Sequence, residues 1–293
     1  MRFMYIPAGL SALIFMTPYA KDFFFEEGVR WLYVLLFSAS LSFFIAPAMK
    51  WISYRFKVLD IPAERKIHEE PTPLLGGGAV FIGVVVPLLM NGILDNEAIA
   101  ILIGGTILFL TGVVNDKREI PAWIRLLIQI AVTIFIFRSG VSLTLFSEDN
   151  IMGLFANLFL SFLWIVGITN TMNFFDGMDG LASGLSIIAA FFIGVSAYIG
   201  GQPVLGWMAV SVLGACIGFF PYNFRLKGPA TIFLGDAGST FLGFVLSSLA
   251  IKGEWSDNNP IVSLTAPLLI FALFIYDTTY ITISRIVEGK VTN

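Results

Sequence analysis

The feature that most constrains this chain is a succession of apolar blocks, each about 15 to 23 residues long, separated by short polar stretches. A helix needs about 20 apolar residues to cross the hydrocarbon core of a bilayer, which is about 30 Å thick. Only 13% of the residues are charged and the mean hydropathy is +0.87, whereas soluble proteins carry about 25% charged residues. The pattern excludes a soluble globular protein and predicts an all-α, polytopic membrane helical bundle.

About ten membrane segments are predicted, and the polar stretches between them are too short for a separate soluble domain. We therefore expect one integral domain over residues 1–293, in which residues 1–30 form an extra N-terminal helix and an outer loop. The first segment is interpreted as a retained helix, with a cleaved signal peptide as the alternative. The predicted segments cover residues 3–20, 31–49, 74–94, 97–114, 122–146, 151–169, 182–199, 204–220, 237–251 and 261–283.

Positive charge is distributed unequally between the two predicted sides of the membrane. If the linkers alternate, 13 of the 17 Lys and Arg residues, Arg125 among them, fall on one side. The positive-inside rule makes this side cytoplasmic and places both termini there. The net charge of −3 gives no basic field for nucleic acid. The single cysteine, Cys216, excludes an internal disulfide and a cysteine-built zinc site.

Four linkers on the predicted cytoplasmic side carry polar groups at helix ends. The first holds Lys66 and His68 and is followed by three glycines at 76–78, an arrangement that suits a diphosphate at a helix N-terminus. A positive-inside anchor with a helix-start turn is the alternative. The second ends an apolar block with Asn115 and Asp116, for which a merely interfacial position is the alternative.

The third linker, residues 170–181, holds the densest polar group. Oxygen-bearing side chains three residues apart lie on one face if the backbone is helical. Gly177 between them permits a turn and exposes backbone amides. Carboxylate and amide oxygens without histidine or cysteine suit a hard cation such as Mg²⁺. The four side chains are Asn170, Asn173, Asp176 and Asp179.

The fourth linker places Asp236 just before an apolar segment, where an ordinary N-cap is the alternative interpretation. Because all four groups lie on one predicted side, they are expected to converge into one cytoplasm-facing site. Acids, a metal and cations at a site open to cytosol and bilayer fit phosphoryl transfer between a soluble and a lipid substrate. A transporter is the rival class, but it predicts ionisable residues at mid-membrane, and the segment interiors are nearly uncharged.

In the same order, these four groups resemble the motifs of the polyprenyl-phosphate N-acetylhexosamine-1-phosphate transferases, glycosyltransferase family 4, over about residues 31–285. The resemblance implies a bacterial inner-membrane enzyme that transfers a sugar 1-phosphate from a UDP-N-acetylhexosamine to undecaprenyl phosphate and releases UMP. This reaction begins envelope polysaccharides such as lipopolysaccharide O-antigen and teichoic acid linkage. The first motif resembles the N-acetylglucosamine branch more than the muramoyl-pentapeptide branch, so UDP-N-acetylglucosamine is the expected donor.

The resemblance also implies roles for individual residues. Asp236 and Asn173 match the ligands of Mg²⁺, with Mn²⁺ as an alternative ion. The catalytic candidates are Asn115, Asp116, Asp176 and Asp236. The candidate substrate-binding residues are Lys66, His68, Asn170, Gly177, Asp179 and Asn223. A homodimer is compatible with the family.

The chain departs from the family pattern at the adjacent acids, because the family has Asp-Asp where this chain has Asn115 and Asp116. An amide cannot accept the proton of the lipid phosphate. If that phosphate has a second pKa of about 6, it is already mostly dianionic at neutral pH, which makes a base dispensable. A catalytically impaired paralogue that binds UDP-sugar is the alternative. The resemblance further implies a His-x-His-His loop after residue 290, and the sequence given ends at Asn293.

Overall fold

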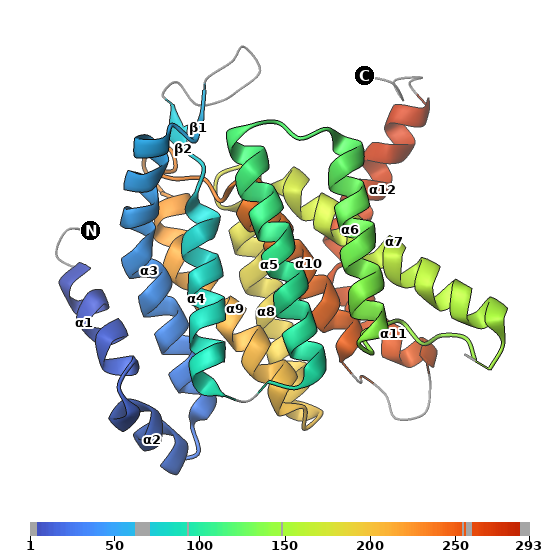
Figure 1. Ribbon diagram of the computed structural model, residues 1–293, viewed down its shortest axis with the longest axis horizontal. Coiled ribbons are helices and arrows are strands. Elements are labelled where there is room, and N and C mark those ends of the chain that lie inside the picture. Colours follow the sequence, from blue (N-terminus) through green and yellow to red (C-terminus); the bar gives the residue numbers. More distant parts are fainter. Residues whose placement is uncertain are drawn as a thin grey trace.

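The computed structural model describes residues 5–61, 71–92, 94–147, 149–253, 255 and 260–287. Within them the chain is almost entirely helical, apart from a two-stranded antiparallel ribbon (Figure 1). The elements are α1 (Tyr5–Phe15), α2 (Pro18–Glu26), α3 (Arg30–Phe56), β1 (Leu59–Asp60), β2 (Thr72–Pro73), α4 (Gly76–Asn91), α5 (Asn96–Lys117), α6 (Ala122–Arg138), α7 (Ile151–Phe175), α8 (Leu181–Ile199), α9 (Pro203–Asn223), α10 (Gly235–Lys252), α11 (Pro260–Ile270) and α12 (Ala272–Val287).

The membrane-spanning character of the chain is confirmed, but the predicted count of about ten spans is not. In the described residues, five helices are long and apolar enough to cross a membrane, namely α3, α5, α7, α8 and α9. The pair α11–α12, bent by 70°, brings the count to six if it is one span. α4 is apolar but has only 16 residues, a length of about 24 Å. Each predicted segment nevertheless contains a helix or a pair of helices.

The first predicted segment is not one continuous helix. α1 has 11 residues and ends at Phe15, so its length of about 17 Å is well short of a bilayer core. Thr17 then begins a new helix, because its side chain accepts a hydrogen bond from the Ala20 amide and Pro18 occupies the first helical position. The Thr-Pro pair therefore divides the segment into α1 and the short α2.

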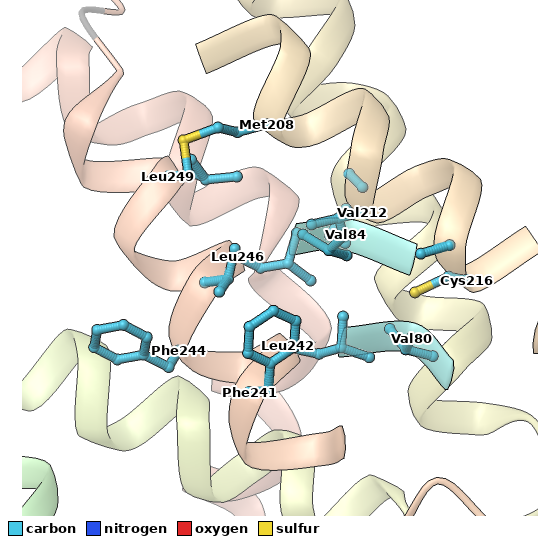
Figure 2. Packing of buried hydrophobic residues seen from close by; sticks show 14 of the residues in the cluster. Val80, Val84, Met208, Val212, Cys216, Phe241, Leu242, Phe244, Leu246 and Leu249 are labelled. Atoms are coloured by element: carbon cyan, nitrogen blue, oxygen red, sulfur yellow. The ribbon is translucent and has the colours of Figure 1, made fainter. Parts of the chain in front are cut away.

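The centre of the bundle is α10, whose residues 237–251 are all buried. It packs against α4, α5, α7, α8 and α9 and lies in the interior in Figure 1. Figure 2 shows the core around it, with apolar side chains of α4 and α9 facing those of α10. The labelled residues are Val80, Val84, Met208, Val212, Cys216, Phe241, Leu242, Phe244, Leu246 and Leu249. This packing fixes the first turn of α10, which carries Asp236.

The two ends of the bundle differ in chemistry. At one end, the ends of α5 and α7 and the start of α10 surround a polar cavity. At the other end, basic side chains are held by neighbouring helices: Lys21 donates to the Met90 carbonyl over 3.1 Å, and Arg30 donates to Asn91. Lys252 pairs there with Asp95 over 2.9 Å and also with Glu97.

Candidate active site

The polar cavity has a volume of about 950 Å³ and collects residues from four of the polar linkers. β1 and the segment after it contribute one wall, and the loop before α10 contributes another. Seven predicted site residues line it together: Asn115, Asp116, Asn173, Asp176, Gly177, Asp179 and Asp236. Residues up to 121 positions apart in the sequence thus meet at one end of the bundle, as the topology predicted.

Asp236 is the most highly connected acid in the cavity. Asp236 is not the N-cap of α10. Leu234 occupies that position, and its side chain makes no capping hydrogen bond. Instead, Asn173 donates from Nδ2 to Oδ1 of Asp236 over 2.6 Å, and Asn115 donates from Nδ2 to Oδ2. This geometry favours the functional interpretation of Asp236 over the N-cap alternative.

Asp116 supplies the cap of α10 from another helix. Its Oδ1 accepts the Asp236 amide over 2.8 Å, and its Oδ2 accepts the Ala237 amide over 3.1 Å. A carboxylate at a helix N-terminus is stabilised by the unpaired amides and by the helix dipole. Gly235 makes the approach feasible: its φ is +74°, and a Cβ there would lie 2.8 Å from Oδ2 of Asp116. Asp116 therefore couples the end of α5 to the start of α10.

Asp176 follows directly after α7 and faces the other two acids. Desolvation raises the pKa of its carboxyl well above the ordinary value, and the charges of Asp116 and Asp236 raise it further. A hydrogen bond from the Gly235 backbone opposes this shift. Three acidic side chains thus share a partly desolvated space, and a cation bound among them would relieve their repulsion.

The glycine run at 76–78 approaches protein backbone rather than offering free amides. The Gly76 amide donates to the Phe233 carbonyl over 3.0 Å, and the Gly77 amide donates to the Leu234 carbonyl over 2.7 Å. A Cβ on Gly77 would lie 2.3 Å from Cα of Gly238. The expectation of a diphosphate on these amides is therefore wrong, because the loop before α10 already occupies them. The predicted close backbone approach is confirmed.

The polar group at 170–181 is only partly on one helical face, because α7 ends at Phe175. Asn173 reaches Asp236, whereas Asn170 points to α6 and exchanges hydrogen bonds with Gln129 at 3.0 and 3.3 Å. Asp179 lies in the turn beyond α7 and accepts the Ala230 amide over 2.7 Å.

One more predicted binding position, Asn223, does not line the cavity, and two others lie outside the described residues. Asn223 is buried; it accepts the Ser183 hydroxyl over 2.7 Å and donates to the Ile232 carbonyl over 3.3 Å. Asn223 thus stabilises the loop before α10 through its hydrogen bond to Ile232. Lys66 and His68 lie outside the described residues.

Arg125 lies beside the site, although its sequence position indicated only a charge at a helix end. Its NH1 lies 3.3 Å from Oδ2 of Asp236, and its Nε is buried without a hydrogen-bond partner among the described residues. The guanidinium is partly exposed beside Asp236, so its charge suits an anion bound at this place. The signal in the sequence was a lone cation in the first turn of an apolar helix that starts at the same end as the acids.

The donor set suits a hard cation shared with a ligand. Within the described part of the chain, no three histidine, cysteine or carboxylate side chains lie close enough to hold a metal ion by themselves. Mg²⁺, however, commonly binds through one or two carboxylates together with substrate phosphates and water. Asp236, with the amide of Asn173 beside it, could serve such an ion.

Fold and site together define a multi-pass membrane protein whose helices bring acidic side chains from distant parts of the chain to one cavity. The sequence belongs to glycosyl transferase family 4, whose model matches residues 98–254. The family resemblance is therefore confirmed, and the matched segment contains Asn115, Asp116, Asn173, Asp176 and Asp236.

Three relatives illustrate the similarity. The chain is 36% identical over 270 residues to a probable undecaprenyl-phosphate N-acetylglucosaminyl 1-phosphate transferase of Bacillus subtilis, covering 90% of this chain and 74% of the relative. It is 29% identical to the decaprenyl-phosphate N-acetylglucosaminephosphotransferase of Mycobacterium tuberculosis, covering 80% and 65%. It is 33% identical to a phospho-N-acetylmuramoyl-pentapeptide-transferase of Thermodesulfovibrio yellowstonii, covering 76% and 72%.

Proposed function

We propose that this protein transfers N-acetylglucosamine 1-phosphate from UDP-N-acetylglucosamine to undecaprenyl phosphate, giving a polyprenyl-diphosphate sugar and UMP. The names of the Bacillus subtilis and Mycobacterium tuberculosis relatives support a polyprenyl-phosphate acceptor and an N-acetylglucosamine donor. The muramoyl-pentapeptide relative keeps the second branch of the family as the competing donor class.

The observation that carries the proposal is the meeting of Asp116, Asp176 and Asp236 at one cavity, with Arg125 against Asp236. Acids together with an arginine suit a diphosphate bound through a divalent cation. The cavity volume of about 950 Å³ leaves room for a nucleotide sugar. Both substrates must reach this place, one from water and one from the bilayer, and a site at the end of a helical bundle is compatible with both routes.

The protein's own residues position the reacting groups. An oxygen of the lipid phosphate attacks the β-phosphorus of the UDP-sugar, a new P–O bond forms, and the bond from that phosphorus to the bridging oxygen breaks, so that UMP leaves. Mg²⁺ bound at Asp236 and Asn173 would neutralise the diphosphate. Arg125 would bind a phosphate oxygen through the exposed part of its guanidinium, and Asp116 keeps Asp236 in place through the first turn of α10.

We place the cavity on the cytoplasmic side of the bacterial inner membrane, with both termini on the same side. The support is the charge asymmetry, because most of the Lys and Arg residues lie in the linkers at the cavity end. Of the four basic residues at the opposite end, Lys21, Arg30 and Lys252 form hydrogen bonds or ion pairs with neighbouring helices. A cytoplasmic site gives direct access to soluble UDP-sugars.

The test is UMP release by the purified full chain with undecaprenyl phosphate and Mg²⁺. UDP-N-acetylglucosamine, UDP-N-acetylgalactosamine and UDP-N-acetylmuramoyl-pentapeptide are compared as donors, each with and without EDTA. The proposal predicts EDTA-sensitive release that is fastest with UDP-N-acetylglucosamine. Release from the pentapeptide donor alone would transfer the protein to the other branch, and release unaffected by EDTA would overturn the role of Mg²⁺.

Asn115 motivates the second candidate function, a binding protein that retains the fold without turnover. Equilibrium binding of UDP-N-acetylglucosamine, measured by calorimetry on the same preparation, separates the two. Binding without UMP release from any donor would favour the paralogue.

A further inference from the structure

We infer that Asn115 is a positioning residue that holds the carboxylate of Asp236 with a neutral amide and does not act as a base in the reaction. This inference deepens the proposed function and rests on it. Asn115 occupies the position at which the family pattern has an acid, so its hydrogen bonds decide whether it can replace that acid or does something different.

The orientation of the Asn115 amide is fixed by its two partners. The Ile120 amide donates to Oδ1 of Asn115 over 2.7 Å, which requires the oxygen on that side. Nδ2 therefore faces Asp236 and donates to its Oδ2. A flipped amide would place two donors against each other at Ile120 and two acceptors against each other at Asp236. Asn115 thus acts as a donor toward Asp236, the opposite of a proton acceptor.

Its neighbour Asp116 is equally engaged. Both of its carboxylate oxygens accept backbone amides from the first turn of α10. Two consecutive residues of α5 therefore hold Asp236 from two directions. The Asp116 carboxylate accepts the backbone amide of Asp236, and the Asn115 side chain donates to the Asp236 carboxylate. In the described residues, neither of the two oxygens of Asp116 is left without a donor.

Charge explains why an amide suits this position. Asp116, Asp176 and Asp236 already repel one another in a partly desolvated space, as the raised pKa of Asp176 indicates. A carboxylate at position 115 would point at Oδ2 of Asp236 and would add a fourth negative charge. The amide instead contributes a donor to a charged acceptor, which is a strong type of hydrogen bond.

The consequence for the reaction is that no proton passes to residue 115. The lipid phosphate attacks as its dianion, one P–O bond forms, one breaks, and the released UMP carries the electron pair of the broken bond. The phosphate is mostly in that form at neutral pH if its second pKa is about 6. The protein contributes position and charge rather than base catalysis.

The experiment compares Asn115→Asp and Asn115→Ala with Asn157→Ala as a matched control. Like Asn115, Asn157 accepts a backbone amide, that of Phe146 over 3.0 Å, but it is fully buried and lies on α7 far from the cavity. The melting temperature of each full-length protein is measured in detergent with EDTA and with MgCl₂, and UMP release is measured alongside.

We expect Asn115→Asp to lower the melting temperature more in EDTA than in MgCl₂, because the cation relieves the added repulsion. Asn115→Ala should lower kcat about tenfold or more while changing the KM for UDP-N-acetylglucosamine less than about threefold, since a hydrogen bond to a charged group is lost. Asn157→Ala should lower the melting temperature equally in both conditions.

A rise of tenfold or more in kcat on Asn115→Asp would overturn the inference, because it would show that the position works as a base. An equal loss of melting temperature with and without Mg²⁺ in Asn115→Asp would overturn it as well. The melting measurements need no substrate. If the wild-type chain releases no UMP, the proposed function fails while the positioning role of Asn115 is still decided.

Discussion

Asp236 owes its position to residues from three other helices. Asp116 binds its amide, Asn173 and Asn115 bind its two carboxylate oxygens, and Arg125 lies 3.3 Å from Oδ2. A side chain held by so many partners has little rotamer freedom left to lose when a cation or a phosphate arrives, which favours tight and specific geometry.

Replacing Asp236 by Asn keeps the shape and removes the charge. We expect UMP release to fall at least about 100-fold, because the proposed anionic ligand of Mg²⁺ is lost. The matched control is Asp95→Asn, since Asp95 pairs with Lys252 at the opposite end of the bundle. Initial rates at saturating Mg²⁺ measure both variants. A full rate for Asp236→Asn would remove this residue from the mechanism, and a loss in Asp95→Asn would point to damage of the fold.

Arg125 provides a second prediction at this scale. Arg125→Ala should lower kcat at least tenfold, and Arg125→Lys should recover only part of it, because lysine keeps the charge but not the planar fork of donors. Arg138→Ala, at the exposed opposite end of the same helix, is the control and should retain activity. Equal rates for Arg125→Ala and wild type would contradict a role in phosphate binding.

The sequence predicted the acids but not how they are used. Asp116, Asp176 and Asp236 could be recognised by their residue type and helix-end positions. The interhelical cap formed by Asp116 could not, because it depends on the contact between α5 and α10. The pairing of Asn170 with Gln129 likewise depends on how α6 and α7 are rotated, which the polar pattern leaves open.

At the scale of the element, the site depends on close contacts between helix ends. A Cβ on Gly112 of α5 would lie 2.4 Å from Cα of Ala237, and a Cβ on Gly77 of α4 would lie 2.3 Å from Cα of Gly238. Small residues at these crossings let helix backbones approach closely, as is common in membrane bundles. The start of α10 is therefore clamped between α4 and α5.

Gly112→Ala tests this clamp. The added methyl group meets backbone that cannot move aside, so we expect a loss of about 1–3 kcal/mol in stability and a lower rate of UMP release. Gly167→Ala in α7 is the control, because a Cβ there has no neighbour within 4 Å among the described residues; it should be neutral or stabilising by about 0.5–1 kcal/mol. Thermal unfolding in detergent distinguishes the two. Equal melting temperatures would argue against a tight α5–α10 contact.

Hydropathy predicted where the helices lie better than how each one continues. The predicted ranges 151–169 and 182–199 fall within α7 and α8, because long apolar runs leave few alternatives in a bilayer. The division of the first segment at Thr17 and the 70° bend between α11 and α12 were not predicted. Such interruptions depend on capping residues and on packing between helices. They leave the mean hydropathy of the segment almost unchanged, so a hydropathy pattern does not reveal them.

At the scale of the whole molecule, the polar cavity and the paired basic residues occupy opposite ends of the bundle. This arrangement predicts labelling from opposite sides of the membrane. Arg118→Cys should react with an impermeant maleimide only in inverted vesicles, and Tyr198→Cys only in intact cells; both positions are exposed. Cys216 is buried and should remain unlabelled. The reverse pattern would invert the proposed topology.

The burial of α10 has a consequence for how the protein is made. α10 is not among the helices that are apolar enough to cross a membrane alone, and its hydroxyl side chains at 239, 240, 247 and 248 face protein rather than lipid. A nascent α10 leaving the translocon therefore depends on its earlier partners α4, α5, α7, α8 and α9 to enter the bilayer. Asp236 at its start can reach the site only after those five helices have been synthesised, so the site is assembled late in biogenesis, when α10 enters the bundle.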